Sequence, residues 1–199
     1  MVRGRDERSR LTRMPNQTAI IIAMTVAGLT SSFMFMLVIP IQAELPGLLN
    51  ASRADTAWVV TSTLLAAAII APISGRLGDM YGKRRIVLIL LAAMVLGSVL
   101  AAVSSELVLV IIGRTLQGAM TGVIPLGIAI LRDTLHQNRV DTAIALNSAT
   151  MGIGGAIGMP LSAYVAEIGD WHLLFWMSAV LGAICFILVI WFIPPSVLR

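Results

Sequence analysis

The sequence carries little charge. Of its 199 residues, 12% are charged and 58% are hydrophobic, and its mean hydropathy is +0.92. A typical soluble domain has about 25% charged residues. The shortage of charge therefore argues against a soluble globular protein, and the large apolar fraction excludes a disordered chain.

Cysteine and histidine are scarce too. The single cysteine, Cys185, lies in an apolar run, so an intrachain disulfide and a disulfide-stapled secreted scaffold are excluded. The two histidines, His136 and His172, fall between different apolar runs, in loops that we predict to lie on opposite sides of a membrane. They therefore cannot share a metal ion. The sequence has no H-E-x-x-H, phosphate-binding-loop or G-x-S-x-G motif. We therefore expect no metal site, no cofactor and no enzymatic activity.

Long apolar runs dominate what is present. A helix that crosses the hydrocarbon core of a bilayer needs about 20 mostly apolar residues. Six stretches meet this requirement, at residues 18–43, 57–77, 86–103, 107–131, 143–166 and 173–193. We predict an all-α membrane protein in which residues 17–195 form a bundle of six transmembrane helices. Residues 1–16 would be a basic cytoplasmic tail, and residues 196–199 the start of a cytoplasmic linker or the end of the chain.

The positions of the basic residues predict the orientation. All but two of the 14 Lys and Arg residues fall in the N-terminal tail, in residues 76–85, in residues 132–141 or at Arg199. These segments lie on one side if the helices alternate, and a bias of this kind places both termini in the cytoplasm. In a soluble protein the net charge of +4 would suggest nucleic acid as a partner. Here the basic residues separate apolar runs, so we expect the lipid bilayer as the partner and no nucleic acid.

The first apolar run follows a basic segment, as in a signal peptide. It is longer than the apolar core of a signal peptide and five more spans follow it, so we expect it to remain in the mature protein. Met14 is an alternative start, in which case the Arg-rich segment before it would not be translated.

Arg114 is the clearest functional candidate inside a span. A charged side chain at the middle of a membrane costs about 2.5–3.5 kcal/mol on insertion scales. We therefore expect Arg114 to face a polar partner or a wet cavity, where it would tune a protonatable group or bind an anionic substrate. Gln117 follows three residues later on the same helical face. In the alternative interpretation, Arg114 lies near the outer helix end and extends to water.

Two further segments stand out. Span five contains Gly154, Gly158 and Pro160, which favour close helix approach and a kink; they predict a hinge, a sliding surface or ordinary packing. Residues 75–85 contain three glycines, which permit a tight turn, and Asp79 beside four basic residues. Asp79 could bond the N–H groups at a helix N-terminus. The alternative is a plain basic loop facing anionic lipids.

These segments resemble the signatures of the major facilitator superfamily. Residues 75–85 resemble the family's loop between helices two and three, residues 114–118 its helix-four motif, and residues 154–160 the helix-five motif of its antiporters. Residues 45–46, 58–61 and 171–175 resemble strings found in the fourteen-helix drug–proton antiporter subgroup. The resemblance covers almost the whole chain, from about residue 18 to residue 199.

The resemblance implies the N-terminal six-helix half of a multi-pass transporter in the plasma (inner) membrane. It implies proton-coupled export of a drug-like small molecule by alternating access, with two halves rocking around one site. Arg114, with Gln117, would lie in the cavity and influence proton binding, and span five would join the sliding contact between halves. The cytoplasmic latch against the other half would consist of Gly75, Asp79, Gly82, Lys83, Arg84, Arg85, Asp133 and Arg139.

Three departures from the family pattern shape the expectations. The subgroup's usual helix-one aspartate is replaced by Leu37, which leaves Glu44 as the nearby acid and candidate proton site. In span five, Met159 separates a glycine and a proline that are usually adjacent. A second six-helix half is absent from these 199 residues. The chain is thus a fragment of a longer transporter, one half of a homodimer or of a two-chain assembly, or a non-transporting half-size protein such as a sensor, binding or partner module.

Overall fold

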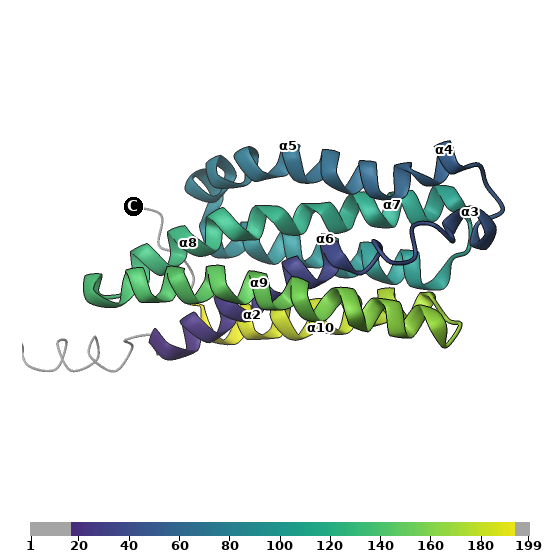
Figure 1. Cartoon of the computed structure of the whole chain (residues 1–199). Coiled ribbons are helices and arrows are strands. Elements are labelled where there is room, and N and C mark those ends of the chain that lie inside the picture. Colours follow the sequence, from purple (N-terminus) through teal and green to yellow (C-terminus); the bar gives the residue numbers. More distant parts are fainter. Residues whose placement is uncertain (1–16, 194–199) are drawn as a thin grey trace, which may run out of the picture.

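A computed structural model of the protein describes residues 17–193 and shows an all-helical bundle in that range (Figure 1). Six helical spans are long and apolar enough to cross a membrane, so the predicted all-α, six-helix fold is confirmed. The predicted tail (1–16) and residues 196–199 lie outside the described residues. The elements are α2 (Gln17–Met36), α3 (Leu45–Leu48), α4 (Arg53–Thr56), α5 (Trp58–Tyr81), α6 (Lys83–Val103), α7 (Leu107–Gly118), the 3-10 turn η1 (Ala119–Gly122), α8 (Val123–Thr134), α9 (Gln137–Glu167) and α10 (His172–Phe192).

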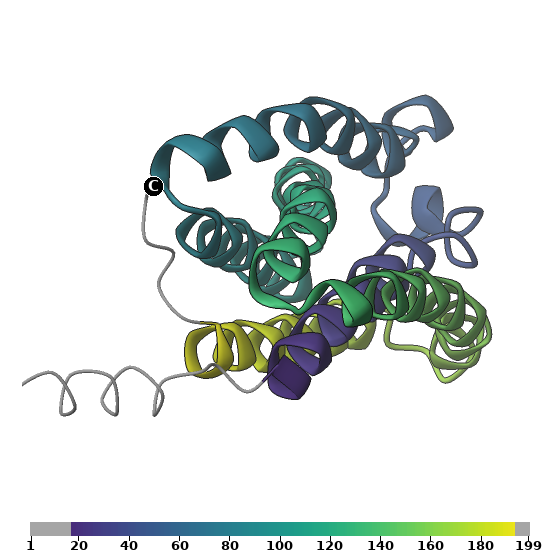
Figure 2. The ribbon, with the colours of Figure 1, turned by 90° about the vertical axis from the view of Figure 1, so that its left-hand side faces the viewer.

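The helices lie roughly side by side along one bundle axis. Viewed along that axis, α2, α9 and α10 lie on one side and α5 lies on the other, with α6, α7 and α8 between them (Figure 2). Helix α2 packs against both α9 and α10, while α6 packs against α7 and α10. The spans that contain α5 and α9 are the least buried of the six, with 22% of the most apolar stretch of each buried.

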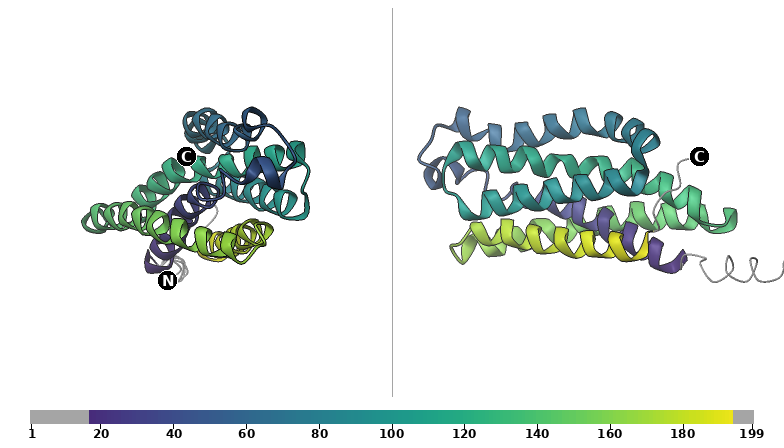
Figure 3. Two further views of the ribbon diagram at one scale, coloured as in Figure 1. Left: turned by 45° about the vertical axis from the view of Figure 1, so that its right-hand side comes forward. Right: turned by 180° about the vertical axis from the view of Figure 1, so that it is seen from behind.

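The two ends of the bundle differ in charge. We call the end where α2 begins, α5 meets α6 and α8 meets α9 the basic end (Figure 3). It carries Arg76, Lys83, Arg84, Arg85, Arg132 and Arg139. The opposite end carries α3, α4 and the connections between α6 and α7 and between α9 and α10.

Two buried apolar clusters fill the interior. The cluster nearer the basic end includes Ile20, Leu91, Met94, Met120 and Leu126. The cluster nearer the opposite end includes Phe33, Leu37, Val59, Val110 and Phe175. Close packing of these apolar side chains between the helices helps to fix the positions of the polar groups described below.

Span one is shorter than predicted. The expected helix over 18–43 ends at Met36, and turns continue from residue 37 to residue 44. Pro40 causes the difference, because it has no N–H to donate to the carbonyl of Met36 four residues earlier. The amide of Ile39 bonds that carbonyl instead, at 3.3 Å. The buried hydroxyl of Ser162 on α9 donates to the carbonyl of Leu37, which satisfies another backbone group in the apolar interior.

The junction of α5 and α6 is tighter than predicted. Instead of a connection over 78–85, both helices continue until Gly82 alone separates them. Gly82 has φ +95°, a conformation that glycine adopts without strain. Gly75 and Gly78 lie within α5, so they are not part of the turn. Gly78 instead lets α5 approach α8, since a Cβ there would come within 2.3 Å of Leu126 Cδ2.

Candidate functional site

Arg114 is enclosed by the bundle. Its side chain is 1% exposed, so it neither extends to water, as the alternative interpretation proposed, nor lines an open cavity. Its Nη1 donates a hydrogen bond to Oε1 of Gln117 at 2.7 Å, one helical turn along α7. Its Nε lies 3.4 Å from the carbonyl oxygen of Val59 on α5. In this conformation the guanidinium therefore lies between α5 and α7.

Gln117 continues this chain of hydrogen bonds to two other helices. Its Nε2 donates to Oγ of Ser98 on α6 at 2.7 Å and lies 3.5 Å from Oγ of Ser178 on α10. The two serine hydroxyls are 3.3 Å apart, and Ser98 also bonds the carbonyl of Met94 at 2.8 Å. Gln117, Ser98 and Ser178 are all fully buried. We call Arg114, Gln117, Ser98 and Ser178 the interior network.

The interior network contains a positive charge and no negative one. Within residues 17–193, the ion pairs closer than 4 Å are Lys83–Asp133 and Asp170–His172, and neither involves Arg114. The charge of Arg114 is therefore stabilised by dipoles of the Gln117 amide and the Val59 carbonyl. A buried charge without a paired ion is costly, which marks Arg114 as a functional candidate.

Glycines bring the helices of this network together. A Cβ at Gly113 on α7 would come within 2.6 Å of the carbonyl oxygen of Gly97 on α6. On the other face, a Cβ at Gly118 would come within 2.5 Å of the carbonyl oxygen of Thr63 on α5. Such close approach of backbones is how small residues promote helix packing in membranes.

The basic end brings together part of the predicted cytoplasmic latch. Lys83, at the start of α6, pairs with Asp133 on α8 at 2.5 Å. Arg84 donates from Nη2 to the carbonyl of Ile190 in the last turn of α10, at 2.8 Å. The helix dipole also stabilises a cation at this C-terminal end. Asp133 therefore pairs with Lys83 rather than Arg139, which is exposed.

Asp79 does not cap the neighbouring helix. It lies in the last turn of α5 and is exposed, whereas α6 begins after Gly82 with no side-chain cap. The expectation that Asp79 bonds the N-terminus of an adjacent helix is therefore wrong for α6. Asp79, Arg85 and Arg139 have no ion-pair partner within the described part of the chain.

The two predicted helix-five glycines pack inside the bundle, whereas Pro160 does not. A Cβ at Gly154 would come within 2.5 Å of the carbonyl oxygen of Leu29 on α2, and one at Gly158 within 3.2 Å of Phe33 and Met36. Both glycines thus lie in the contact between α9 and α2. Helix α9 continues through Pro160, which is exposed.

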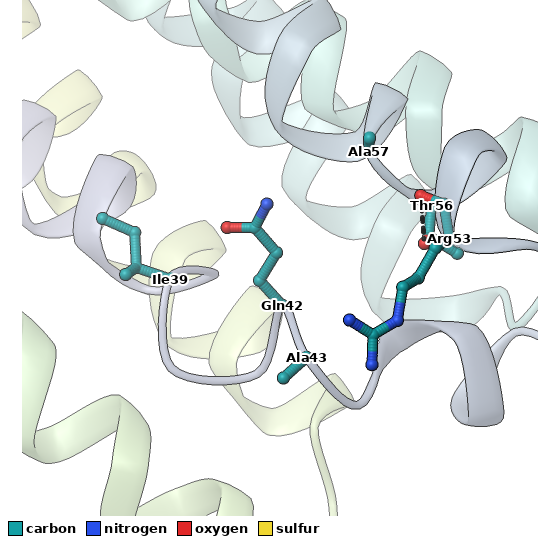
Figure 4. Close-up of a pocket in the computed structure, with 6 residues that line it drawn as sticks. All are labelled: Ile39, Gln42, Ala43, Arg53, Thr56 and Ala57. Atoms are coloured by element: carbon teal, nitrogen blue, oxygen red, sulfur yellow. Dashed lines mark hydrogen bonds between the residues drawn. The ribbon is translucent and has the colours of Figure 1, made fainter.

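Glu44 and Leu37 lie apart from the interior network. Leu37 is 1% exposed and belongs to the apolar cluster of the opposite end. Glu44 is exposed in the segment between α2 and α3. Beside it is an open pocket of about 420 Å³, where the side chains of Gln42 and Arg53 are the long polar groups (Figure 4). The other lining residues are Ile39, Ala43, Thr56 and Ala57.

Sequence reasoning found Arg114 and Gln117 but missed Ser98 and Ser178. A polar residue in an otherwise apolar span was the available signal at both serines. Within residues 17–193, no group of three His, Cys, Asp or Glu side chains is placed to hold a metal ion.

Comparison with known proteins agrees with this fold. Residues 20–198 match the Major Facilitator Superfamily. The chain is 30% identical over 181 residues to the Probable multidrug resistance protein EmrY of Escherichia coli K12, covering 88% of this chain and 35% of that protein. It is 31% identical over 130 residues to the Uncharacterized MFS-type transporter YvkA of Bacillus subtilis, covering 65% of this chain and 29% of that protein. The chain thus spans about a third of the length of these curated relatives.

Solved structures share the fold at low identity. The proton:xylose symporter XylE matches with a TM-score of 0.79 and 15% identity, over 90% of this chain and 45% of that chain. The human organic anion transporter MFSD10 matches with a TM-score of 0.65 and 19% identity, over 91% of this chain and 48% of that chain. From the family match over most of its length, this multi-pass membrane chain belongs to the Major Facilitator Superfamily of transporters.

Proposed function

We propose that this chain is one six-helix half of a proton-coupled exporter of drug-like small molecules. It would work by alternating access in the plasma membrane, with its N-terminus in the cytoplasm. Two relatives support the drug-like substrate class: EmrY and the Multidrug resistance protein 3 of Bacillus subtilis, which is 28% identical over 141 residues. The basic end would then face the cytoplasm, in keeping with the distribution of Lys and Arg in membrane proteins.

The observation that carries this proposal is the uncompensated charge of Arg114. Its guanidinium is buried in a membrane-spanning bundle with no carboxylate within 4 Å among residues 17–193. A charge placed there at such cost is useful if a negative group approaches it during the cycle. Because this bundle has no acid beside Arg114, the negative group would be a proton-carrying carboxylate of a second half, Glu44 after a rearrangement, or the substrate itself.

A second six-helix half would cover the exposed sides of α5 and α9. These helices present large apolar side chains outward, among them Leu64, Leu65 and Ile69 on α5 and Ile153 and Ile157 on α9. The second half would come from the same gene product, a second copy or a separate chain. The contact of α9 with α2 through Gly154 and Gly158, together with Pro160, would let α9 move with α2 as one unit against that half.

The basic end would act as the cytoplasmic latch. Lys83 and Asp133 hold α6 to α8 within this bundle, and Arg84 holds α6 to α10. Asp79, Arg85 and Arg139 remain exposed and would contact the second half. The glycines Gly75 and Gly82 would leave room for that contact. Formation and loss of the latch would accompany closing and opening of the cytoplasmic side.

Two measurements test the proposal. The first is the size of the native product, detected in source-cell membranes with an antibody to the internal segment 132–141. A product well above 21.2 kDa supports one chain that contains both halves, and a product at 21.2 kDa requires a dimer or partner chain.

The second is transport by the native product in liposomes with an imposed pH gradient and ethidium as the probe. We expect ethidium flux that depends on the gradient. We expect Arg114→Ala to abolish this flux, although the variant should reach the membrane in about the same amount as the wild-type protein. Binding of ethidium without flux at any gradient would instead favour a non-transporting module. Normal flux by Arg114→Ala would contradict the role of Arg114.

A further inference from the structure

We infer that Ser98 and Ser178 are positioning residues that orient the Gln117 amide so that it holds Arg114 without neutralising its charge. The inference rests on the proposed proton-coupled transport and adds two residues, from α6 and α10, to its machinery. They act through Gln117 rather than by touching a substrate.

The direction of each hydrogen bond follows from the chemistry of the groups. Arginine has only donors, so Nη1 of Arg114 must meet the carbonyl oxygen Oε1 of Gln117. The amide nitrogen then points the other way, and it requires acceptors in a fully buried place. Oγ of Ser98 accepts at 2.7 Å, and its own proton goes to the Met94 carbonyl at 2.8 Å. Donors thus run in one direction, from Arg114 through Gln117 and Ser98 to the backbone of α6.

Ser178 completes the acceptor side from α10. Its Oγ lies 3.5 Å from Nε2 of Gln117 and 3.3 Å from Oγ of Ser98. With both serines in place, turning the amide around would bring two donors against Arg114 and leave Oε1 facing the serines. Arg114 therefore selects the orientation of the Gln117 amide, and the serine oxygens hold the amide in it by accepting from Nε2. Gln117 in turn fixes the guanidinium.

The network uses neutral groups where an acid would bind Arg114 more strongly. A carboxylate at position 117 would form an ion pair with Arg114 and cancel its field inside the bundle. An amide supported by hydroxyls gives the same geometry and leaves the positive charge free to act on a carboxylate that arrives from outside. Fixed geometry with retained charge is what a coupling group needs in order to favour the ionised form of an approaching acid.

The test compares four variants of the native product: Gln117→Glu, Ser98→Ala with Ser178→Ala, Ser98→Thr, and Ser74→Ala as a matched control. Ser74 is also a buried serine, but its hydroxyl bonds only the carbonyl of Ala71 on its own helix. The measurements are proton-driven ethidium flux across a range of pH, thermal unfolding in detergent, and the rate at which phenylglyoxal modifies Arg114, read by mass spectrometry.

We expect Gln117→Glu to unfold at or above the wild-type temperature while its flux falls roughly tenfold or more, because an internal ion pair replaces the free charge. The double alanine variant should lose flux, shift its pH profile and speed modification of Arg114. Ser98→Thr should restore both properties towards wild type, and Ser74→Ala should match wild type.

Two results would overturn the inference. One is a Gln117→Glu protein with wild-type flux, and the other is a double alanine variant whose flux and Arg114 modification both equal those of wild type. Absence of proton-driven flux in the wild type is a different outcome. It would refute the proposed function, and the modification rates would still decide whether the serines position Arg114.

Discussion

The interior network and the basic end both contain charged motif residues, but these residues differ in whether their partners lie inside the bundle. Arg114 and Gln117 find hydrogen-bond partners on α5, α6 and α10, within the bundle. At the basic end, Lys83 and Asp133 pair at positions that are 21% and 57% exposed, and Asp79 is exposed without an ion-pair partner among residues 17–193. The interior network therefore depends on helix packing inside this chain, whereas the basic end has groups available to something outside it.

The strongest way to break this comparison is to disturb the packing around the interior network. Gly113→Ala would place a Cβ about 2.6 Å from the Gly97 carbonyl, so α6 and α7 must separate. Overpacking of this kind costs about 1–3 kcal/mol. We expect a clear fall in the thermal unfolding temperature in detergent.

Gly152→Ala is the matched control for Gly113→Ala. A Cβ at Gly152 meets no atom within 4 Å, and alanine favours helix over glycine by about 1 kcal/mol. We therefore expect Gly152→Ala to unfold at or slightly above the wild-type temperature. Equal unfolding temperatures for the two variants would contradict the close contact of α6 and α7.

The second largest effect is expected at Asp79, and on transport rather than stability. Asp79→Asn removes an exposed charge with no ion-pair partner in the described residues, so thermal unfolding should not change. If Asp79 stabilises one state of the transport cycle, losing about 1 kcal/mol of that interaction changes flux about fivefold. Flux in liposomes and unfolding in detergent, measured on the same preparation, separate the two effects.

Ser162→Ala tests an interior bond outside the network. It removes the hydroxyl that donates to the Leu37 carbonyl where α2 ends early. Hydrogen bonds between helices in membranes contribute about 0.6 kcal/mol on average. We expect a small drop in stability, measured by unfolding in a graded mixture of mild and denaturing detergent. Thr30→Val is a suitable comparison, because the Thr30 hydroxyl bonds only the Val26 carbonyl of its own helix.

The smallest effect is expected at the Lys83–Asp133 pair. Both side chains are partly exposed, and exposed pairs contribute about 0.2–1 kcal/mol. A double-mutant cycle with Lys83→Ala and Asp133→Ala should give a coupling energy in this range that decreases as salt is added. A coupling of several kcal/mol would show that the basic end is as self-contained as the interior network.

The six spans could be predicted because the hydrocarbon core demands about 20 apolar residues per helix, and the sequence displays that requirement directly. Helix ends were less accessible, since helices continue past the apolar run wherever backbone groups remain satisfied. Helix α9, for example, begins at Gln137 rather than near residue 143. At the other extreme, α2 ends early because of Pro40. The prediction counted apolar residues and did not take this proline into account.

The candidate site divides in the same way. Arg114 and Gln117 were predicted together because side chains three residues apart in a helix lie on the same face. Ser98 and Ser178 were not, because their partnership with Gln117 joins three helices and is decided by packing. The residues of the cytoplasmic latch were recognised from their sequence motif, yet which acid pairs with which base depends on how α6 lies against α8.

The single glycine between α5 and α6 has a consequence for motion. Consecutive Cα atoms are about 3.8 Å apart, so one residue leaves almost no slack between the two helices. A tilt of α5 during a conformational change must displace the first turn of α6 by a similar amount. That turn carries Lys83 and Arg84, which are attached to α8 and α10. Because Gly82 leaves so little slack, a movement of α5 at the basic end is passed directly to α6. Through Lys83 and Arg84 it also reaches α8 and α10.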